Sequence, residues 1–167
     1  MNGSSFVAKS SKNIILLNSV YLYFVLDLGF LYNFYMVKIA HINLSVSNME
    51  KSTSFYDKVL FSLGFTRGLN DNGDWGAVLG YKGDGIELEI IHENNKEYKP
   101  FNRFVGLNHI CFEVEDREKV DEMYELVKTL DVKITRKPRE YPEYTDKYYA
   151  FYFRDPDGIP LEIAVVQ

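Results

Sequence analysis

The hydrophobic and polar positions of the chain follow two periods, one typical of strands and one of helices. Residues 41–46 alternate polar and apolar, as expected of a strand with one buried face. The next stretch carries apolar residues at helical spacing, with Ser47 or Asn48 as its cap and Gly64 at its end. Strand-like runs follow at 65–69, 75–81 and 86–91, separated by turn signals at 70–73 and 82–85. The pattern predicts a β-α-β-β-β unit.

The same order of elements recurs in the second half of the chain. We predict a strand at 107–114, a helix at 116–130 and strands at 132–136, 148–154 and 161–166. A polar linker at 92–103 joins the two units, and a loop at 137–147 interrupts the second. One helix cannot cover both faces of a four-stranded sheet, so two such units are expected to pair around a shared interior.

The predicted fold is therefore α+β, with two tandem β-α-β-β-β modules that form a cupped mixed sheet. We predict a single domain at residues 36–167, made of modules 37–92 and 106–167.

The two modules also repeat in sequence at both ends. Residues 41–59 match residues 109–127 at a constant offset of 68, with seven identities that include His41/His109 and Tyr56/Tyr124. Residues 84–90 match 157–163 at six of seven positions, which relates Glu89 to Glu162. Each module thus begins with a histidine-bearing strand and ends with a glutamate-bearing strand.

Strand parity sends these histidines and glutamates to one side of the sheet. The alternate apolar residues of each strand must pack under its helix, so His41, His109 and Glu162 face the opposite way, toward the concave side. Glu87 and Glu89 both face that side, and the repeat alignment favours Glu89. Buried carboxylates and imidazoles are costly unless they are paired or bind a metal ion.

Two imidazoles and two carboxylates suit one divalent ion such as Zn, Ni, Co, Mn or Fe(II). We therefore predict His41, Glu89, His109 and Glu162 as metal ligands. The alternative is two His–Glu pairs without a metal ion.

Composition and charge argue against some classes of function. The net charge is −5 and no long basic run exists, which argues against binding to nucleic acid. The only cysteine is Cys111, so no internal disulfide can form, and we expect a cytoplasmic protein. Cys111 is interpreted as a small core residue, or alternatively as a catalytic or metal-binding thiol, because it shares a face with His109.

Residues 1–35 form a hydrophobic extension with three interpretations. It is a translated region upstream of a true start at Met36, a membrane anchor, or an extra helix that covers the domain. Residues 14–35 are long enough to span a bilayer, but Asp27 near their middle would cost about 2.5–3.5 kcal/mol. We expect no membrane association.

Three segments together resemble the vicinal oxygen chelate superfamily: AHINLSVSNMEKSTSFYDKVL, GLNHICFEV and FRDPDGIPLEI. That superfamily includes glyoxalase I, methylmalonyl-CoA epimerase, extradiol dioxygenases, and fosfomycin and bleomycin resistance proteins. The resemblance covers residues 37–167 and implies paired modules with a metal ion in the cup. A full His/Glu/His/Glu set looks most like glyoxalase I.

The resemblance implies a metal-dependent lyase or isomerase for a small substrate with vicinal oxygens, such as the hemithioacetal of an α-oxoaldehyde. Glu162 would be the catalytic base, and Glu89 the second ligand or a partner base. The alternatives are a non-catalytic resistance protein that binds an antibiotic, and an Fe(II) ring-cleavage dioxygenase. We expect a small-molecule substrate and a homodimer.

Further candidate residues could bind or cover a substrate at the mouth of the cup. Arg67, Arg103 and Lys137 are candidate partners for an anionic substrate tail, and each is also interpretable as a solvated surface charge. Four tyrosines are candidates for a lid, or alternatively for ordinary loop and strand positions: Tyr141, Tyr144, Tyr148 and Tyr149. His92 follows its strand with the wrong parity and is expected to be exposed.

Overall fold

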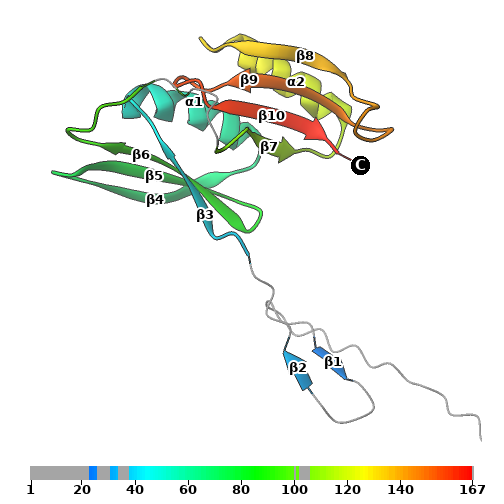
Figure 1. The fold of residues 1–167 in the computed structure, drawn as a ribbon, viewed down its shortest axis with the longest axis horizontal. Coiled ribbons are helices and arrows are strands. Elements are labelled where there is room, and N and C mark those ends of the chain that lie inside the picture. Colours follow the sequence, from blue (N-terminus) through cyan, green and yellow to red (C-terminus); the bar gives the residue numbers. More distant parts are fainter. Residues whose placement is uncertain (1–22, 26–30, 34–37, 100, 102–105, 167) are drawn as a thin grey trace, which may run out of the picture. The chain divides into compact units, whose positions relative to one another are not determined.

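The computed structural model describes residues 23–25, 31–33, 38–99, 101 and 106–166 (Figure 1). The chain divides into two compact units, Met1–Lys38 and Ile39–Gln167. In the first unit, β1 (Tyr23–Val25) and β2 (Leu31–Asn33) pair antiparallel, so the described part of the extension is strand rather than the helix considered above. The rest of that prediction lies outside the described residues. Among the helices that the structure describes, none is long and apolar enough to cross a membrane.

The first module of the second unit has the predicted element order. Its elements are β3 (His41–Ser45), α1 (Met49–Ser62), β4 (Thr66–Gly73), β5 (Gly76–Gly83) and β6 (Ile86–Glu93). The sheet order is β3-β6-β5-β4, in which β3 and β6 are parallel and the other neighbours antiparallel. Asn48 caps α1, because its side chain accepts a hydrogen bond from the backbone N–H of Lys51 at 2.8 Å.

The second module repeats this topology, as the sequence repeat predicts. Its elements are β7 (Ile110–Glu113), α2 (Arg117–Lys128), β8 (Ile134–Glu140), β9 (Tyr149–Arg154) and β10 (Pro160–Val165). The order β7-β10-β9-β8 again has one parallel pair, β7 with β10. Asp116 caps α2 by accepting from the backbone N–H of Lys119 at 2.8 Å. The α+β prediction is confirmed, and each module forms its own four-stranded mixed sheet.

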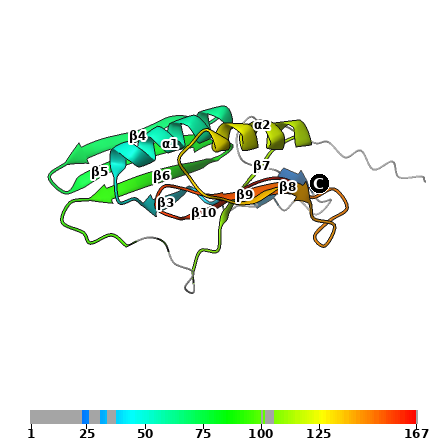
Figure 2. The same cartoon turned by 90° about the horizontal axis from the view of Figure 1, so that it is seen from above.

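A shared core under the two helices joins the modules (Figure 2). Buried residues from both helices and from the helix-facing sides of both sheets form one cluster that includes Tyr56, Ile90, Met123 and Ile163. On β3 the alternation is as predicted, since Leu44 is 4% exposed whereas its neighbours Asn43 and Ser45 are exposed. The faces that the helices leave uncovered are therefore the faces that carry the predicted ligands.

Two strands extend further than predicted. The run at 70–73, taken above as a turn, continues β4 to Gly73, and Gly73 pairs with Gly76 across a two-residue turn, Asp74 and Trp75. Likewise, β8 continues to Glu140 into the predicted loop. The turn prediction was wrong because polar residues can occupy an edge strand whose outer face meets solvent.

The Asp-Pro-Asp-Gly turn at residues 155–158 ties the second module to α1 of the first. Asp155 accepts hydrogen bonds from the Tyr56 hydroxyl at 2.9 Å and from the backbone N–H of Ile159 at 2.7 Å. Asp157 accepts from the backbone N–H of Ser47 at 3.0 Å and also from the Ser47 hydroxyl. The two carboxylates thus fix the start and the middle of α1 against the second module.

Asp155 gives this junction a pH dependence. Burial outweighs its hydrogen bonds and raises its pKa from 3.8 to about 6, so the folded protein holds a proton there that the unfolded chain releases at lower pH. This contribution to stability is full below about pH 4 and is lost as the pH rises through about 6. We expect Asp155→Asn, which mimics the protonated acid, to gain up to about 3 kcal/mol relative to wild type between pH 4 and pH 7.

Urea unfolding of both proteins at several pH values measures this difference. A stability difference that stays constant from pH 4 to pH 7 would exclude Asp155 as the titrating group. Tyr149→Phe, which removes a hydrogen bond to the exposed side of α2, serves as a control that should show no such trend.

Candidate functional site

The second module brings two of the predicted ligands into contact. His109 lies immediately before β7 and Glu162 lies on β10, and the parallel pairing of these strands places their side chains together. His109 Nε2 is 2.8 Å from Glu162 Oε2, and the carboxylate side chain is only 1% exposed. His109 Nδ1 lies 2.8 Å from Asn108 Oδ1, which fixes the orientation of the ring.

Glu162 is held by a second contact on its other oxygen. The Tyr148 hydroxyl donates a hydrogen bond to Glu162 Oε1 at 2.8 Å. Burial and the neighbouring Glu162 carboxylate raise the pKa values of Tyr148 and Tyr152 well above their usual range. Both phenols are therefore neutral donors at neutral pH, and the carboxylate is oriented between an imidazole and a phenol.

Cys111 lies beside this pair and is exposed, so its interpretation as a core residue was wrong. It is opposite Glu162 in the β7–β10 register, on the same face as His109. Partial burial of the thiol and the adjacent Glu162 carboxylate raise the pKa of Cys111 to about 12. The thiol is thus protonated at neutral pH, which makes it a poor nucleophile in this state.

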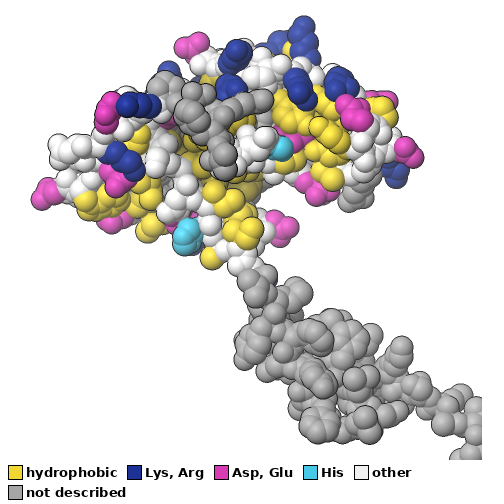
Figure 3. Space-filling model, in the orientation of Figure 1, with side chains coloured by type: hydrophobic (Ala, Val, Ile, Leu, Met, Phe, Trp, Pro, Cys, Tyr) yellow, Lys and Arg dark blue, Asp and Glu magenta, His cyan; other side chains and the backbone are white. Residues whose placement is uncertain are grey.

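Tyrosines form a wall next to the His109–Glu162 pair. Tyr141, Tyr144, Tyr148 and Tyr152 contact one another through ring pairs with centroids 5.1–6.0 Å apart. Tyr141 is fully buried and its hydroxyl has no hydrogen-bond partner among the described residues. Figure 3 shows hydrophobic side chains gathered on this side of the second module, with a histidine at their edge. In this structure Tyr141, Tyr148 and Tyr152 form a wall beside the pair, and Tyr144 packs on it from the loop with 57% of its surface exposed.

Tyr149, the fourth predicted lid residue, lies on the helix-facing side of β9. Its hydroxyl donates a hydrogen bond to Asp121 of α2 at 2.9 Å. Tyr152 was not among the predicted site residues. Its position ten residues before Glu162 across a hairpin was the available signal, since that spacing pairs the two residues.

The first module distinguishes Glu87 from Glu89. Glu87 accepts a hydrogen bond from the backbone N–H of Leu69 at 2.8 Å, at the bulge in β4. A Cβ at Gly68 or Gly80 would collide with the Glu87 carboxylate, so both glycines leave room for it. Glu87 therefore has a structural role in closing the bulge.

Glu89 is 9% exposed and has no hydrogen bond or ion pair with any described residue. It lies opposite Asn43 of β3, while exposed His41 lies opposite Glu87. Neither of its carboxylate oxygens is among the fully buried polar atoms that lack a partner, so the carboxylate reaches the surface on the uncovered face.

The four predicted ligands do not meet within one chain. Among the described residues, no three or more His, Cys, Asp or Glu side chains lie close enough together to hold a metal ion. His109 and Glu162 form one half of the expected set in the second module, and His41 and Glu89 lie on the first.

The other candidates lie elsewhere. Arg67 pairs with Asp57 of α1 at 2.6 Å, on the helix side of the first sheet, so it does not reach the cup. Arg103 lies outside the described residues. Lys137 is exposed on β8. His92 is half-buried rather than exposed, because its Nδ1 contacts the Val46 carbonyl at 2.9 Å and its ring stacks on Tyr98.

Two β-α-β-β-β modules, each with a four-stranded mixed sheet, define the class of proteins built from this duplicated unit. The chain belongs to the glyoxalase/bleomycin resistance protein/dioxygenase superfamily, whose family model matches residues 38–163. The match confirms the resemblance drawn from the sequence motifs.

Individual known proteins share part of the sequence or the fold. The chain is 30% identical over 125 residues to the uncharacterized protein YqjT of Bacillus subtilis, which covers 74% of this chain and 94% of that protein. A glyoxylase/bleomycin resistance protein/dioxygenase domain from Frankia is 21% identical, with a TM-score of 0.66 over 79% of this chain and 99% of that one.

A glutamate-to-glutamine mutant of the fosfomycin resistance protein FosX from Listeria monocytogenes, in complex with Mn(II) and 1S,2S-dihydroxypropylphosphonic acid, is 20% identical. Its TM-score is 0.58 over 79% of this chain and 92% of that one. The two structural likenesses concern the fold.

Proposed function

We propose that the protein is a divalent-metal-dependent lyase or isomerase of the glyoxalase type, acting on a small substrate with vicinal oxygens. The observation that carries this proposal is the convergence of His109 Nε2 and Glu162 Oε2 at 2.8 Å, with Tyr148 on the second carboxylate oxygen. The proposed ligands are His41, Glu89, His109 and Glu162.

The residues present fit a metal ion. The His109 ring lies between Asn108 Oδ1, 2.8 Å from Nδ1, and Glu162 Oε2, 2.8 Å from Nε2. A divalent ion would bind at Nε2, and the Asn108 contact at Nδ1 would hold the ring in the orientation for it. The unpartnered Glu89 carboxylate supplies the matching oxygen donor on the first module.

In this proposal the bound ion supplies Lewis-acid stabilisation of negative charge on the substrate oxygens. Glu162 moves a proton between adjacent substrate carbons as general base and then acid. Tyr148 orients the carboxylate, and the tyrosine wall excludes water from one side of the reacting atoms. The FosX complex supports the choice of ligand class, because that protein binds Mn(II) together with a vicinal diol.

Metal binding tests the proposal directly. Purified protein stripped with chelator should be stabilised by about 2.7 kcal/mol at a free Ni²⁺ or Zn²⁺ concentration one hundred times Kd. Urea unfolding with and without the added ion measures this stabilisation.

Absence of stabilisation, and of metal in freshly purified protein, would favour the non-catalytic resistance protein instead. Metal binding with Fe(II)-dependent ring cleavage, and no isomerase activity toward methylglyoxal and a thiol, would favour the dioxygenase. Glu113→Gln, on β7 opposite Ala164, is the matched control and should bind metal like wild type.

A further inference from the structure

A row of side chains crosses the second sheet from the His109–Glu162 pair to its edge. The register places Cys111 opposite Glu162, Glu162 opposite Tyr152, and Tyr152 opposite Arg136. Neighbouring strands lie about 4.8 Å apart, and directly opposed residues share a face. The row therefore runs from the proposed metal ligands, across an aromatic ring, to a cation on β8.

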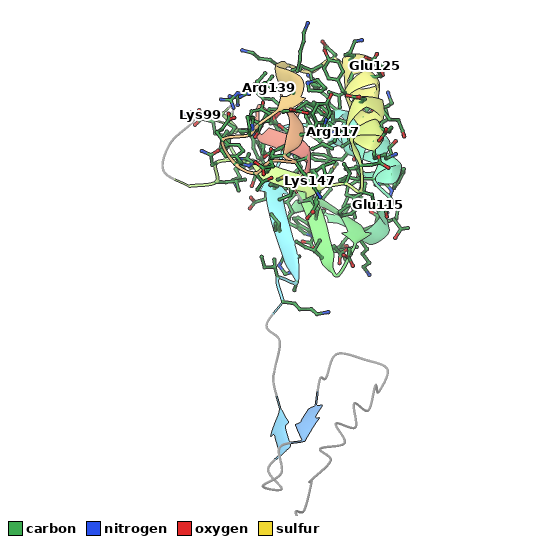
Figure 4. All side chains as sticks on the ribbon, turned by 90° about the vertical axis from the view of Figure 1, so that its right-hand side faces the viewer. Lys99, Glu115, Arg117, Glu125, Arg139 and Lys147 are labelled. Atoms are coloured by element: carbon green, nitrogen blue, oxygen red, sulfur yellow. The ribbon has the colours of Figure 1, made fainter. Side chains whose placement is uncertain are left out.

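A bulge is what turns Arg136 toward this face. Ile134 pairs with Phe153 and packs in the core under α2, and two residues later Arg136 would lie on the same side in a regular strand. The register shift between them moves Arg136 opposite Tyr152 instead. A second shift brings Arg139 opposite Ala150, again on the uncovered face, and Figure 4 shows Arg139 on the side of β8 away from α2. Bulges that re-aim side chains are frequent beside functional sites.

Arg136 differs from Arg139 in forming no ion pair with a described residue, although its charge contributes, after a backbone hydrogen bond and Arg139, to the lowered pKa of Glu143. Arg139 pairs with Glu143 at 3.1 Å, and its guanidinium carbon lies 3.6 Å from the Tyr141 ring centroid. Arg136 has no ion pair with any described residue. Its guanidinium carbon lies 5.2 Å from the Tyr152 ring centroid, a position that leaves N–H donors free at its edges.

The Tyr152 ring separates this guanidinium from the proposed metal ligands. The His109 ring is 6.1 Å from the Tyr152 centroid, at an angle of 78°. A ligand bound at His109 and Glu162 can thus extend a short carbon chain over Tyr152 toward Arg136. The neutral Tyr152 phenol does not repel an anion there, and its ring offers an apolar surface for methylene groups.

We propose that Arg136 binds an anionic group of the substrate, so that the substrate carries vicinal oxygens at one end and a carboxylate or similar oxyanion at the other. This assignment rests on the proposed function. The planar guanidinium fork matches the two oxygens of a carboxylate, which distinguishes this position from a surface lysine. It also replaces Arg67 and Lys137 as the cation for a substrate tail.

Two hydroxamates test the assignment on the nickel-loaded protein. Acetohydroxamate offers two vicinal oxygens and no tail, and succinic monohydroxamate adds a carboxylate tail of suitable length. By titration calorimetry we expect the tailed probe to bind about tenfold more tightly, as a charged hydrogen bond implies. In Arg136→Met this preference should vanish while acetohydroxamate binding stays unchanged, and Arg136→Lys should keep part of it.

The controls separate this assignment from the proposed function. Lys137→Met removes a neighbouring exposed cation and should retain the tenfold preference. Equal binding of both probes to wild type overturns the anion site and leaves the metal site standing. Equal weakening of both probes in Arg136→Met shows a structural role only, and also overturns it. Failure of both probes to bind the metal-treated wild type overturns the metal site and this assignment together, whereas failure of the tailed probe alone overturns only the anion site.

Discussion

Glu162→Gln should lower the isomerase activity by roughly 10³-fold, the size expected when a general base is removed. Gln is nearly isosteric and can still accept from the Tyr148 hydroxyl, so the fold is expected to persist. It cannot take up the substrate proton, and its neutral oxygen is a weaker partner for a cation than the carboxylate beside His109. Turnover of methylglyoxal with a thiol, measured with each protein saturated with Ni²⁺, gives the comparison.

Metal affinity provides an independent measurement on the same variant. We expect the Kd for Ni²⁺ to rise at least tenfold, while Glu113→Gln changes neither affinity nor turnover. A Glu162→Gln protein with full turnover would exclude this carboxylate as the base. If the variant loses Ni²⁺ affinity but keeps normal turnover at saturating metal, Glu162 is a metal ligand and not the base. Glu89 would then be the candidate base.

The elements and faces of the fold could be predicted because the chain carries the same pattern twice. The alternation around His41 and the buried positions on either side of Glu162 each indicate which side of a strand meets the helix, and the structure agrees with both. The shared face of His109 and Glu162 follows from strand parity, whereas the parallel pairing of β7 with β10, which brings them within 2.8 Å, is visible only in the structure. Local periodicity and a repeat were sufficient for the elements and their faces.

Other features depend on register, which the sequence does not display. Glu87 and Glu89 have the same parity along β6. Only the bulge in β4 shows that Glu87 accepts a hydrogen bond from the backbone N–H of Leu69. The bulges in β8 place Arg136 on the face opposite to the one that simple alternation would give. The distance between the two half-sites depends on how the modules pack, and the helices join them through residues that are merely apolar in the sequence.

The separation of the half-sites leads to the second large expected effect, which concerns two chains. His41 and Glu89 lie on the uncovered face of one sheet and His109 and Glu162 on the uncovered face of the other, so a second copy can bring the two faces together. In a symmetric dimer each site would then take one half from each chain. A heterodimer of His41→Ala and Glu162→Gln chains contains one intact site and one doubly damaged site, and should recover about half of the wild-type activity.

Co-expression with two affinity tags yields this heterodimer in pure form, and both parent homodimers should be nearly inactive. The reciprocal heterodimer joins a wild-type chain to a His41→Ala/Glu162→Gln chain and has the same composition of side chains. Between-chain sites leave it inactive, because each of its sites has one damaged half. Within-chain sites reverse both results: the wild-type chain then keeps its own complete site, and the His41→Ala with Glu162→Gln pair recovers nothing. The two heterodimers differ only in how identical residues are distributed between chains, so their activity ratio reports where the halves of the site meet.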